Sequence, residues 1–410
     1  MLTVAVIGAG AAGCFCAAQL RRLAPELAVT VFEAGSRPLA KVAITGGGRC
    51  NLTNDFQGIR SLGEAYPRGE RVMQRALKAF SEQDTVAWFT ERGVPCVLQP
   101  DHCWFPRSQD AMDVVRCLER GMKGVELRLG TRVQSIERCP VKPGMTGMTC
   151  MTDMTGMTVD GEPFDYVVVT TGGAPQFPFL RALELEIVPP VPSLFTFNIP
   201  DKSLTALMGL VVDAQLSLQG TAYKAAGPLL ITDWGLSGPA TLKLSSYAAR
   251  HLAQQGYKGT LLVNWLGKAE NLAREWLQKT AAENPQKQIS SVHPVQQRLW
   301  MHLLAKAGLR PQMRWAELGS KGMNRLTAIL TADSYPISGK SRFREEFVTA
   351  GGVALSNVNL STLESKQHPG LYFAGEVLDI DAITGGFNLQ AAWSTGYVCA
   401  QSLARKATAG

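Results

Sequence analysis

The chain has 410 residues, of which 46% are hydrophobic and 18% charged, and its formal net charge at pH 7 is +7. This length exceeds one ordinary hydrophobic core, so we expect two or three compact units. The sequence holds no apolar run of about eighteen residues and starts directly with a strand pattern, so we expect neither a membrane span nor a secretion signal. Nine cysteines without a Cys-x-x-Cys pair disfavour a disulfide framework and a metal site, and we expect a cytoplasmic protein.

The N-terminal segment carries a dinucleotide-binding pattern. Leu2–Ile7 is a short β-branched run typical of a buried parallel strand, and Gly8-Ala-Gly-Ala-Ala-Gly13 leads from it into helix formers. A second apolar run, Ala28–Phe32, ends at Glu33. The glycines allow a tight turn and close approach of a pyrophosphate to the helix N-terminus, and the acid can accept hydrogen bonds from a ribose. The alternative is a glycine-rich turn of an ordinary βα unit.

A second glycine-rich stretch, Lys41–Asn51 (KVAITGGGRCN), follows. Three consecutive glycines do not suit the interior of a helix or strand. We therefore expect a loop whose backbone can approach a ligand, with Thr45, Arg49 and Asn51 on either side. Farther along, residues 68–92 are expected to be helical, and residues 125–129, 132–136 and 165–171 to be strands.

The middle of the chain differs from both ends. Prolines cluster at 189–192, and the pattern changes there from α/β to short strands. We expect an insert over residues 189–338, β-rich at 189–268 and 310–338 and helical at 269–309. It holds fifteen Lys and Arg against eight Asp and Glu, whereas the remainder holds 26 of each. The excess of seven positive charges suits an anionic partner such as RNA, and a merely solvated basic surface is the simpler alternative.

The last seventy residues return to the α/β pattern. Gly370–Glu376 (GLYFAGE) has the form of a short strand ending in glycine and acid, and Gly385–Gln390 is a second glycine-rich turn that enters a helix. Such a turn suits a ligand that carries or develops negative charge. One dinucleotide is therefore expected to be held from both ends of the chain, in a discontinuous α/β domain formed by residues 1–188 and 339–410.

This layout resembles the two-part FAD-binding fold of the glutathione-reductase superclass. Its finer motifs are similar to those of the YhiN/BaiN-type flavoproteins; they are Ile44–Asn54, Gly235–Ala240, Ala350–Val353, Leu371–Asp381 and Thr384–Gln390. The resemblance implies a Rossmann-like FAD-binding domain with an inserted β-barrel-like part and a helical part. The chain departs from the family at Asp233, where a histidine commonly precedes the Trp-Gly-Leu-Ser-Gly-Pro run.

The resemblance also implies which residues bind FAD. They are Gly8, Gly10, Ala11, Ala12 and Gly13 at the pyrophosphate, Glu33 at the adenosine ribose, Val133 at adenine, Thr171 and Gly172 beside the phosphates, Lys41, Thr45, Gly46, Gly47, Arg49, Cys50 and Asn51 over the ribityl and isoalloxazine groups, and Gly375, Glu376, Gly385, Gly386, Phe387, Asn388 and Leu389 at the ribityl chain and pyrimidine edge.

Two residues are candidate proton donors. Cys50 would need a lowered pKa, which neighbouring Arg49 could provide, and loop packing is the simpler role for it. Asp381 is the second candidate. The chain has no second complete Gly-x-Gly-x-x-Gly motif, so we expect no separate NAD(P)H domain. The flavin would be reduced by NAD(P)H that docks transiently, by another donor or by the substrate itself.

Three functions remain open. The family resemblance implies an FAD-dependent reductase of an activated C=C bond, such as an unsaturated steroid intermediate or a uridine of 23S ribosomal RNA that becomes dihydrouridine. The basic insert favours the RNA substrate. The second function is a flavin oxidase of a small amine or another small molecule, and the third is non-catalytic flavin binding. The sequence sets no oligomeric state.

Overall fold

The computed structural model describes residues 1–138, 156–174, 176–340 and 348–409. The chain forms two compact units, one made of residues 1–191 and 348–410 and the other of residues 192–347. The expected borders at 188/189 and 338/339 thus move to 191/192 and 347/348. The strand β11 (Ile187–Ser193) contains the proline cluster and pairs with β19 (Val348–Val353), so the chain leaves and re-enters the first unit through neighbouring strands.

The first unit is built on a five-stranded parallel sheet. Its strands, in spatial order, are β20 (Leu371–Phe373), β10 (Tyr166–Val169), β1 (Thr3–Ile7), β2 (Ala28–Phe32) and β6 (Glu126–Arg128). The β-branched runs in β1, β2 and β10 are almost wholly buried, as expected for parallel strands covered on both faces. The parallel α/β architecture predicted from the sequence is therefore confirmed.

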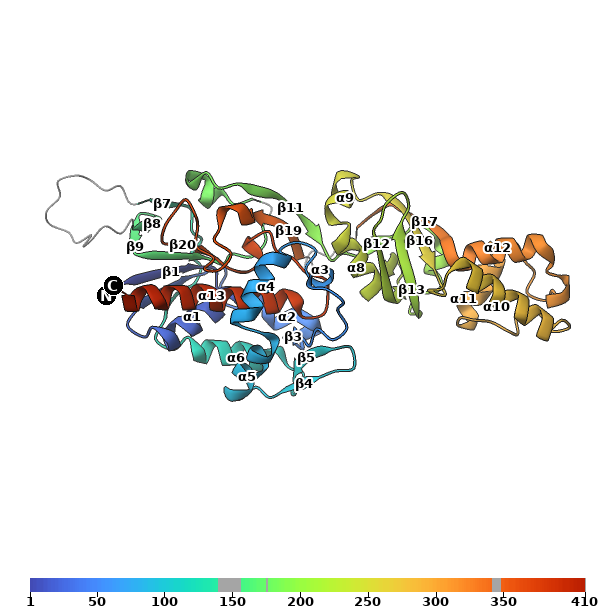
Figure 1. The fold of residues 1–410 in the computed structure, drawn as a ribbon, viewed down its shortest axis with the longest axis horizontal. Helices are drawn as coiled ribbons and strands as arrows, with labels where there is room; N and C mark the ends of the chain where they lie inside the picture. The colour runs from blue at the N-terminus through green and yellow to red at the C-terminus, as the bar shows by residue number, and fades with distance from the viewer. Residues whose placement is uncertain (139–155, 175, 341–347, 410) are drawn as a thin grey trace. The chain divides into compact units, whose positions relative to one another are not determined.

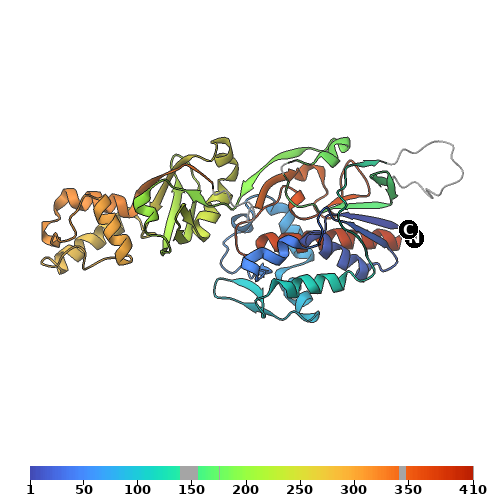
Figure 2. The ribbon, with the colours of Figure 1, turned by 180° about the vertical axis from the view of Figure 1, so that it is seen from behind.

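Two helices from opposite ends of the chain pack together in this unit. They are α1 (Ala11–Leu23) and α13 (Phe387–Ala409), which lie side by side in both views (Figures 1 and 2). A Cβ atom on Gly396 of α13 would lie 2.9 Å from the carbonyl oxygen of Ala12, so glycine permits this close approach. The helices that follow the N-terminal and C-terminal glycine turns are thereby packed against each other.

The helix expected over residues 68–92 is two helices, α4 (Glu70–Ala79) and α5 (Glu82–Glu91). Ser81 separates them because it starts α5 with a capping box: its Oγ accepts from the Asp84 N–H, and the Asp84 carboxylate accepts from the Ser81 N–H. Arg68 lies two residues before α4 and is therefore outside the helix that was expected to include it.

The first unit also contains the following helices and strands. They are α2 (Ala40–Gly48), β3 (Thr53–Asn54), α3 (Leu62–Ala65), β4 (Cys96–Leu98), β5 (Cys103–Pro106), α6 (Ala111–Gly121), β7 (Ile136–Arg138), β8 (Met157–Val159) and β9 (Glu162–Phe164). The strand expected at 132–136 begins only at Ile136. The Gln134 and Ser135 N–H groups instead donate to the Asp160 carboxylate, at 2.9 and 2.8 Å.

The second unit contains a seven-stranded antiparallel sheet. Its strands, in spatial order, are β17 (Asp333–Ile337), β16 (Gly259–Asn264), β13 (Val211–Leu218), β14 (Lys224–Ile231), β15 (Gly235–Ser237), β12 (Phe197–Asn198) and β18 (Gly339–Lys340). Alternating burial along β13 and β17 places apolar side chains in the core that this sheet shares with the helices of the unit.

Six helices accompany this sheet in the described residues. They are α7 (Lys202–Thr205), α8 (Pro239–Tyr247), α9 (Ala249–Gln254), α10 (Glu270–Glu283), α11 (Gln297–Lys306) and α12 (Gly319–Ala332). The expectation of a β-rich 310–338 is wrong over α12, because Gly322, Leu326 and Leu330 recur at the four-residue spacing of one buried helical face. Within the described ranges, no helix combines the length and apolarity needed to cross a membrane.

Candidate functional site: two glycine turns at one sheet edge

The first glycine turn needs glycine at two positions for packing. Gly8 has φ +106°, and its N–H donates to the Phe32 carbonyl oxygen at 2.7 Å. A Cβ on Gly13 would lie 1.9 Å from the Gly8 carbonyl oxygen and 2.5 Å from Thr170 Oγ1. Both glycines therefore let the turn, α1 and β10 pack without a gap.

Gly10 has a different reason to be glycine. A Cβ on this residue would meet nothing within 4 Å, so packing within the protein does not require glycine there. Gly10 is the N-cap of α1, and no side chain caps this helix end. The first-turn N–H groups, including those of Ala11 and Ala12, and the positive end of the helix dipole form a cradle suited to a phosphate. An open space in front of uncapped donors fits the pyrophosphate of a dinucleotide.

Glu33 lies beside this cradle at the end of β2. Its carboxylate accepts from the N–H groups of Ala9 and Gly35, at 2.8 and 2.7 Å. A carboxylate can accept about four hydrogen bonds, so it keeps capacity for a ribose hydroxyl. The N–H of Thr131 donates to the Glu33 carbonyl oxygen at 2.8 Å, which brings the segment leading to buried Val133 next to the same acid.

The turn after β20 meets the same cradle. Gly375 has φ +75°, and a Cβ there would lie 2.8 Å from the Ala12 Cβ. Glu376 accepts from the Thr349 N–H at 2.6 Å, and its other oxygen lies 3.7 Å from the Cβ position of Gly172. The structure thus brings the expected residues at 171–172 and 375–376 to the first turn of α1.

The Lys41–Asn51 segment is partly helical. Residues 40–44 belong to α2, with Lys41 exposed, whereas Thr45, Gly46 and Gly47 leave helical geometry. The loop expected at the glycines is therefore confirmed at residues 45–47, and the residues before them are helical. Arg49 folds back, with Nε donating to the Gly46 carbonyl oxygen at 3.2 Å and the guanidinium lying 4.6 Å from the centre of the Phe105 ring.

The second glycine turn, at the start of α13, is tied to the strands that follow this segment. The Asn51 amide, oriented with its nitrogen toward the Thr53 carbonyl oxygen, accepts from the Gly386 N–H at 3.2 Å. Asn54 Nδ2 donates to the Gly385 carbonyl oxygen at 3.1 Å. A Cβ on Gly386 would lie 2.6 Å from the Thr53 carbonyl oxygen. Glycine there lets the turn lie directly against β3.

The first residues of α13 are held from the other side as well. The Asn388 side chain accepts from the Ala382 N–H and donates to the Ala382 carbonyl oxygen, at 2.9 and 3.0 Å. The Phe387 carbonyl oxygen accepts from the Tyr66 hydroxyl at 2.9 Å. The Asn388 amide therefore fixes the turn, while Leu389 is half-buried beside it.

Cys50 does not have the properties of a reactive thiol. It is fully buried, and burial raises its pKa well above the usual range, so the thiol stays protonated at neutral pH. The expectation that Arg49 lowers this pKa is wrong, because the Arg49 guanidinium lies over Phe105. Cys50 has φ +60° at the end of the glycine segment, and its role in the structure is packing.

Asp381 is a buried carboxylate in a two-pronged ion pair. Arg68 donates to both of its oxygens, from Nε and Nη2, and the side chain of Asp381 is wholly inaccessible. Both carboxylate oxygens are occupied by the guanidinium, so the geometry gives Asp381 a structural role and no support as a proton donor. It joins the segment before α4 to the segment before α13.

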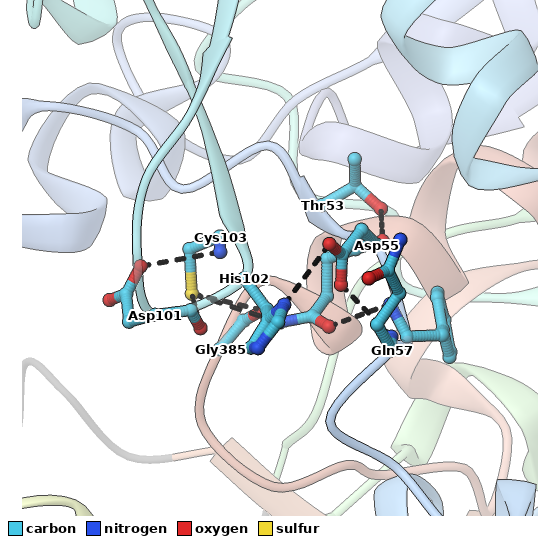
Figure 3. Close-up of polar contacts among 9 residues, drawn as sticks. Thr53, Asp55, Gln57, Asp101, His102, Cys103 and Gly385 are labelled. Atoms are coloured by element: carbon cyan, nitrogen blue, oxygen red, sulfur yellow. Dashed lines mark hydrogen bonds and ion pairs between the residues drawn. The ribbon is translucent and has the colours of Figure 1, made fainter.

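The sequence reasoning missed a histidine–carboxylate pair near the second turn. His102 Nδ1 lies 3.1 Å from Asp55 Oδ2, and Figure 3 shows the two side chains facing each other. Next to them, Cys103 Sγ lies 3.6 Å from the Gly385 carbonyl oxygen. The available signal was the rarity of histidine, since the chain has only five. In the second unit, Asp233 is exposed at the family's histidine position.

Comparison with known proteins covers both units of the chain. The model of the family described as "HI0933-like protein Rossmann domain" matches residues 2–402. A ribosomal RNA dihydrouridine synthase of Escherichia coli is 30% identical over 97% of each chain, and one of Haemophilus influenzae is 29% identical over 98% of each chain. A 3-dehydro-bile acid delta(4,6)-reductase of Clostridium scindens is 27% identical over 99% of this chain and 100% of that protein.

Proposed function

Because the chain belongs to the HI0933-like Rossmann family, we propose that it is an FAD-dependent oxidoreductase that reduces an activated C=C bond, and that its substrate is a uridine of 23S ribosomal RNA. The product would be dihydrouridine, with one hydride and one proton added across the C5=C6 bond. The observation that carries this proposal is the open, uncapped cradle at Gly10 in a chain that matches RNA-reducing relatives over its whole length.

The residues of the first unit fit FAD in particular ways. Ala11 and Ala12 would bind the pyrophosphate through their N–H groups, and Glu33 would bind the adenosine ribose. Bound FAD, once reduced by NAD(P)H, would supply the hydride. The N-terminus of α13, at Gly386 and Phe387, is the positive end of a helix dipole, and it would stabilise negative charge on the pyrimidine edge of a flavin bound beside it.

The charge of the second unit supports RNA as the substrate. The second unit, residues 192–347, holds eighteen Lys and Arg against ten Asp and Glu, whereas the first unit holds 23 against 24. Lys and Arg side chains that neutralise phosphates give affinity that is independent of sequence, which lets a protein hold a large RNA while one base reacts. NAD(P)H is the proposed reductant of the enzyme.

The bile acid reductase relative favours a second candidate function. That protein is similar over nearly the whole of both chains, so the same fold could present a conjugated small-molecule C=C bond to the flavin. A steroid-like enone is therefore the alternative substrate, and in that case the basic insert would have no role in substrate binding.

Two experiments separate these candidates. The gene is deleted and dihydrouridine in 23S ribosomal RNA is quantified by mass spectrometry; purified holoenzyme with NADPH is then added to RNA from the deletion strain. The proposal expects the modification to disappear in the cell and to return in vitro, and a Gly10→Val variant without FAD is the negative control. If dihydrouridine is unchanged in the deletion strain and the enzyme reduces a steroid enone, the substrate is the small molecule and not RNA.

A further inference from the structure

A groove of about 560 Å³ opens within the second unit. Its lining comes from three elements: Asp213 on β13, Lys268 just before α10 and Trp276 within it, and His293 in the segment before α11. This volume lies in the range of small-molecule sites. Neither of the glycine turns contributes to it, so the FAD site does not account for it.

One wall of the groove is a fixed aromatic ring. Trp276 is half-buried and packs edge-on against Trp315, with the ring centres 6.3 Å apart. Trp315 in turn stacks on Trp300 at an interplanar angle of 24°, and the Trp300 indole N–H donates to the Ile289 carbonyl oxygen at 2.7 Å. Trp276 is therefore held from behind, and its exposed part is a rigid platform. Such rings bind nucleobases of any sequence by stacking.

The polar groups of the groove suit the other parts of a nucleotide. Lys268 is exposed and can contact a phosphate, whereas the Asp213 carboxylate can accept from the N–H groups of a base. His293 Nδ1 lies 2.7 Å from the Val295 carbonyl oxygen, so Nδ1 carries the proton and Nε2 can accept from a ribose hydroxyl. The groove therefore combines a cation (Lys268), an acid (Asp213) and an aromatic wall (Trp276).

The surroundings favour RNA as the occupant. Residues 267–332, which form the helical part of this unit, contain ten Lys and Arg and four Glu. All of these cations except Arg274 are exposed. This positive surface complements a phosphate backbone and would repel a basic peptide.

We propose that the groove binds one unpaired nucleotide of the RNA substrate, with its base against Trp276 and its phosphate at Lys268. This inference rests on the proposed function, because it names a docking point for the same RNA. No residue of the glycine turns lines the groove, so the nucleotide that we place in it is a different one from the uridine that is reduced. The groove would thus anchor a single-stranded segment while another base reacts.

Binding to a fluorescein-labelled oligouridylate tests the proposal with full-length oxidised holoenzyme. Trp276→Ala should weaken binding by about 5- to 140-fold, the range for loss of one base stack. Trp276→Phe should restore most of the affinity. Lys268→Glu should weaken binding more than Lys321→Glu, a matched charge reversal at an exposed lysine of α12 outside the groove. Thermal unfolding of each variant confirms that it is folded.

Three results would overturn the inference. Equal affinity of all four variants would show that the groove does not hold RNA. Binding of a polyglutamate peptide that depends on Trp276 and Lys268, with unchanged affinity for oligouridylate, would assign the groove to an acidic protein segment. Failure of the wild-type protein to bind oligouridylate would show that this groove has no RNA-binding role.

Dihydrouridine formation in RNA from the deletion strain, measured on the same variants, keeps this inference separate from the proposed function. If the groove anchors the substrate, Lys268→Glu should raise KM and leave kcat close to the wild-type value. Wild-type kinetics in every variant would contradict RNA binding by the groove and would leave the proposed reductase function intact. If the wild-type enzyme forms no dihydrouridine, the proposed reductase function is contradicted, whatever the result of the binding experiment.

Discussion

At the scale of the single residue, the first turn separates glycines that serve packing from one that serves a ligand. Gly13 faces the Gly8 carbonyl oxygen at a distance that no Cβ could occupy, whereas the space before Gly10 is open. The shared Gly-x-Gly-x-x-Gly spacing hides this difference, and only the backbone geometry shows it.

Substitution by alanine should separate the two roles. Gly13→Ala should lower the free energy of unfolding by about 1–3 kcal/mol or more, because its methyl group overpacks the turn. Gly10→Ala should leave the stability of the apoprotein close to wild type and still reduce FAD content, because its methyl group enters the phosphate space. Urea unfolding and flavin absorbance per protein measure both effects. Gly259→Ala, at another glycine with no neighbour within 4 Å, is the control and should change neither.

Cys50 should resist alkylation in the folded protein. Burial raises its pKa, and the thiolate is the form that reacts, so iodoacetamide at neutral pH should label Cys50 only after unfolding. Mass spectrometry of native and urea-treated samples measures the labelling. Half-buried Cys96, whose pKa burial raises to about 11, gives an internal comparison in the same sample. Rapid labelling of native Cys50 would return it to the list of reactive groups.

Loss of the ion pair between Arg68 and Asp381 should lower the stability of the fold much more than the rate of the reaction. Asp381→Ala removes two charge-assisted hydrogen bonds at a buried site and should cost about 3–5 kcal/mol in urea unfolding. The FAD-bound fraction that remains folded should keep its rate of dihydrouridine formation within a few-fold of wild type. A loss of kcat with unchanged stability would contradict the structural role and support proton transfer by Asp381.

At the scale of the element, a buried polar network joins the helices of the second unit to its sheet. Asp333 accepts from the Trp265 indole N–H at 3.0 Å and from the Tyr335 hydroxyl at 2.6 Å, and it pairs with Lys306 of α11 at 2.5 Å. His302, also on α11, lies 3.3 Å from the Tyr335 hydroxyl. The network therefore ties α11 to β16 and β17.

This network should make the second unit sensitive to acid. Burial lowers the pKa of His302, and Lys306 adds to this effect while Asp333 and Asp201 oppose it. A depressed folded-state pKa means that the contribution to stability is present above the unfolded value of about 6.5 and is lost as pH falls through the folded-state value. His302→Gln should flatten the fall in unfolding free energy between about pH 7 and 5, measured by urea titration at constant ionic strength. An unchanged slope would contradict the assignment.

Some helices and strands were predictable from the sequence and others were not. β1, α1 and β2 were predictable because β-branched runs and glycine spacing are local signals. The break between α4 and α5 depends on the single cap at Ser81, and α12 was masked by its mixture of glycine and polar residues. Arg68 and Asp381 are 313 positions apart, and no local pattern could join them. The structure does not support Cys50 and Asp381 as proton donors for the same reason, because their burial and their partners are set by tertiary packing.

At the scale of the whole molecule, the chain separates cofactor chemistry from charge. The first unit holds both glycine turns, and the second holds the positive excess. If the second unit binds RNA, the logarithm of the association constant should fall linearly with the logarithm of salt concentration, with a slope set by the number of phosphates neutralised. Binding titrations over a salt series measure this slope. A slope near zero would show that the basic surface is only solvated.

The most direct test of the account is an anaerobic single turnover. Holoenzyme is reduced, freed of excess reductant and mixed with 23S ribosomal RNA from the deletion strain, while flavin absorbance and dihydrouridine are followed together. The account predicts that the flavin is reoxidised and that one dihydrouridine forms for each flavin. A flavin that stays reduced in the presence of this RNA, with no dihydrouridine formed, would contradict it.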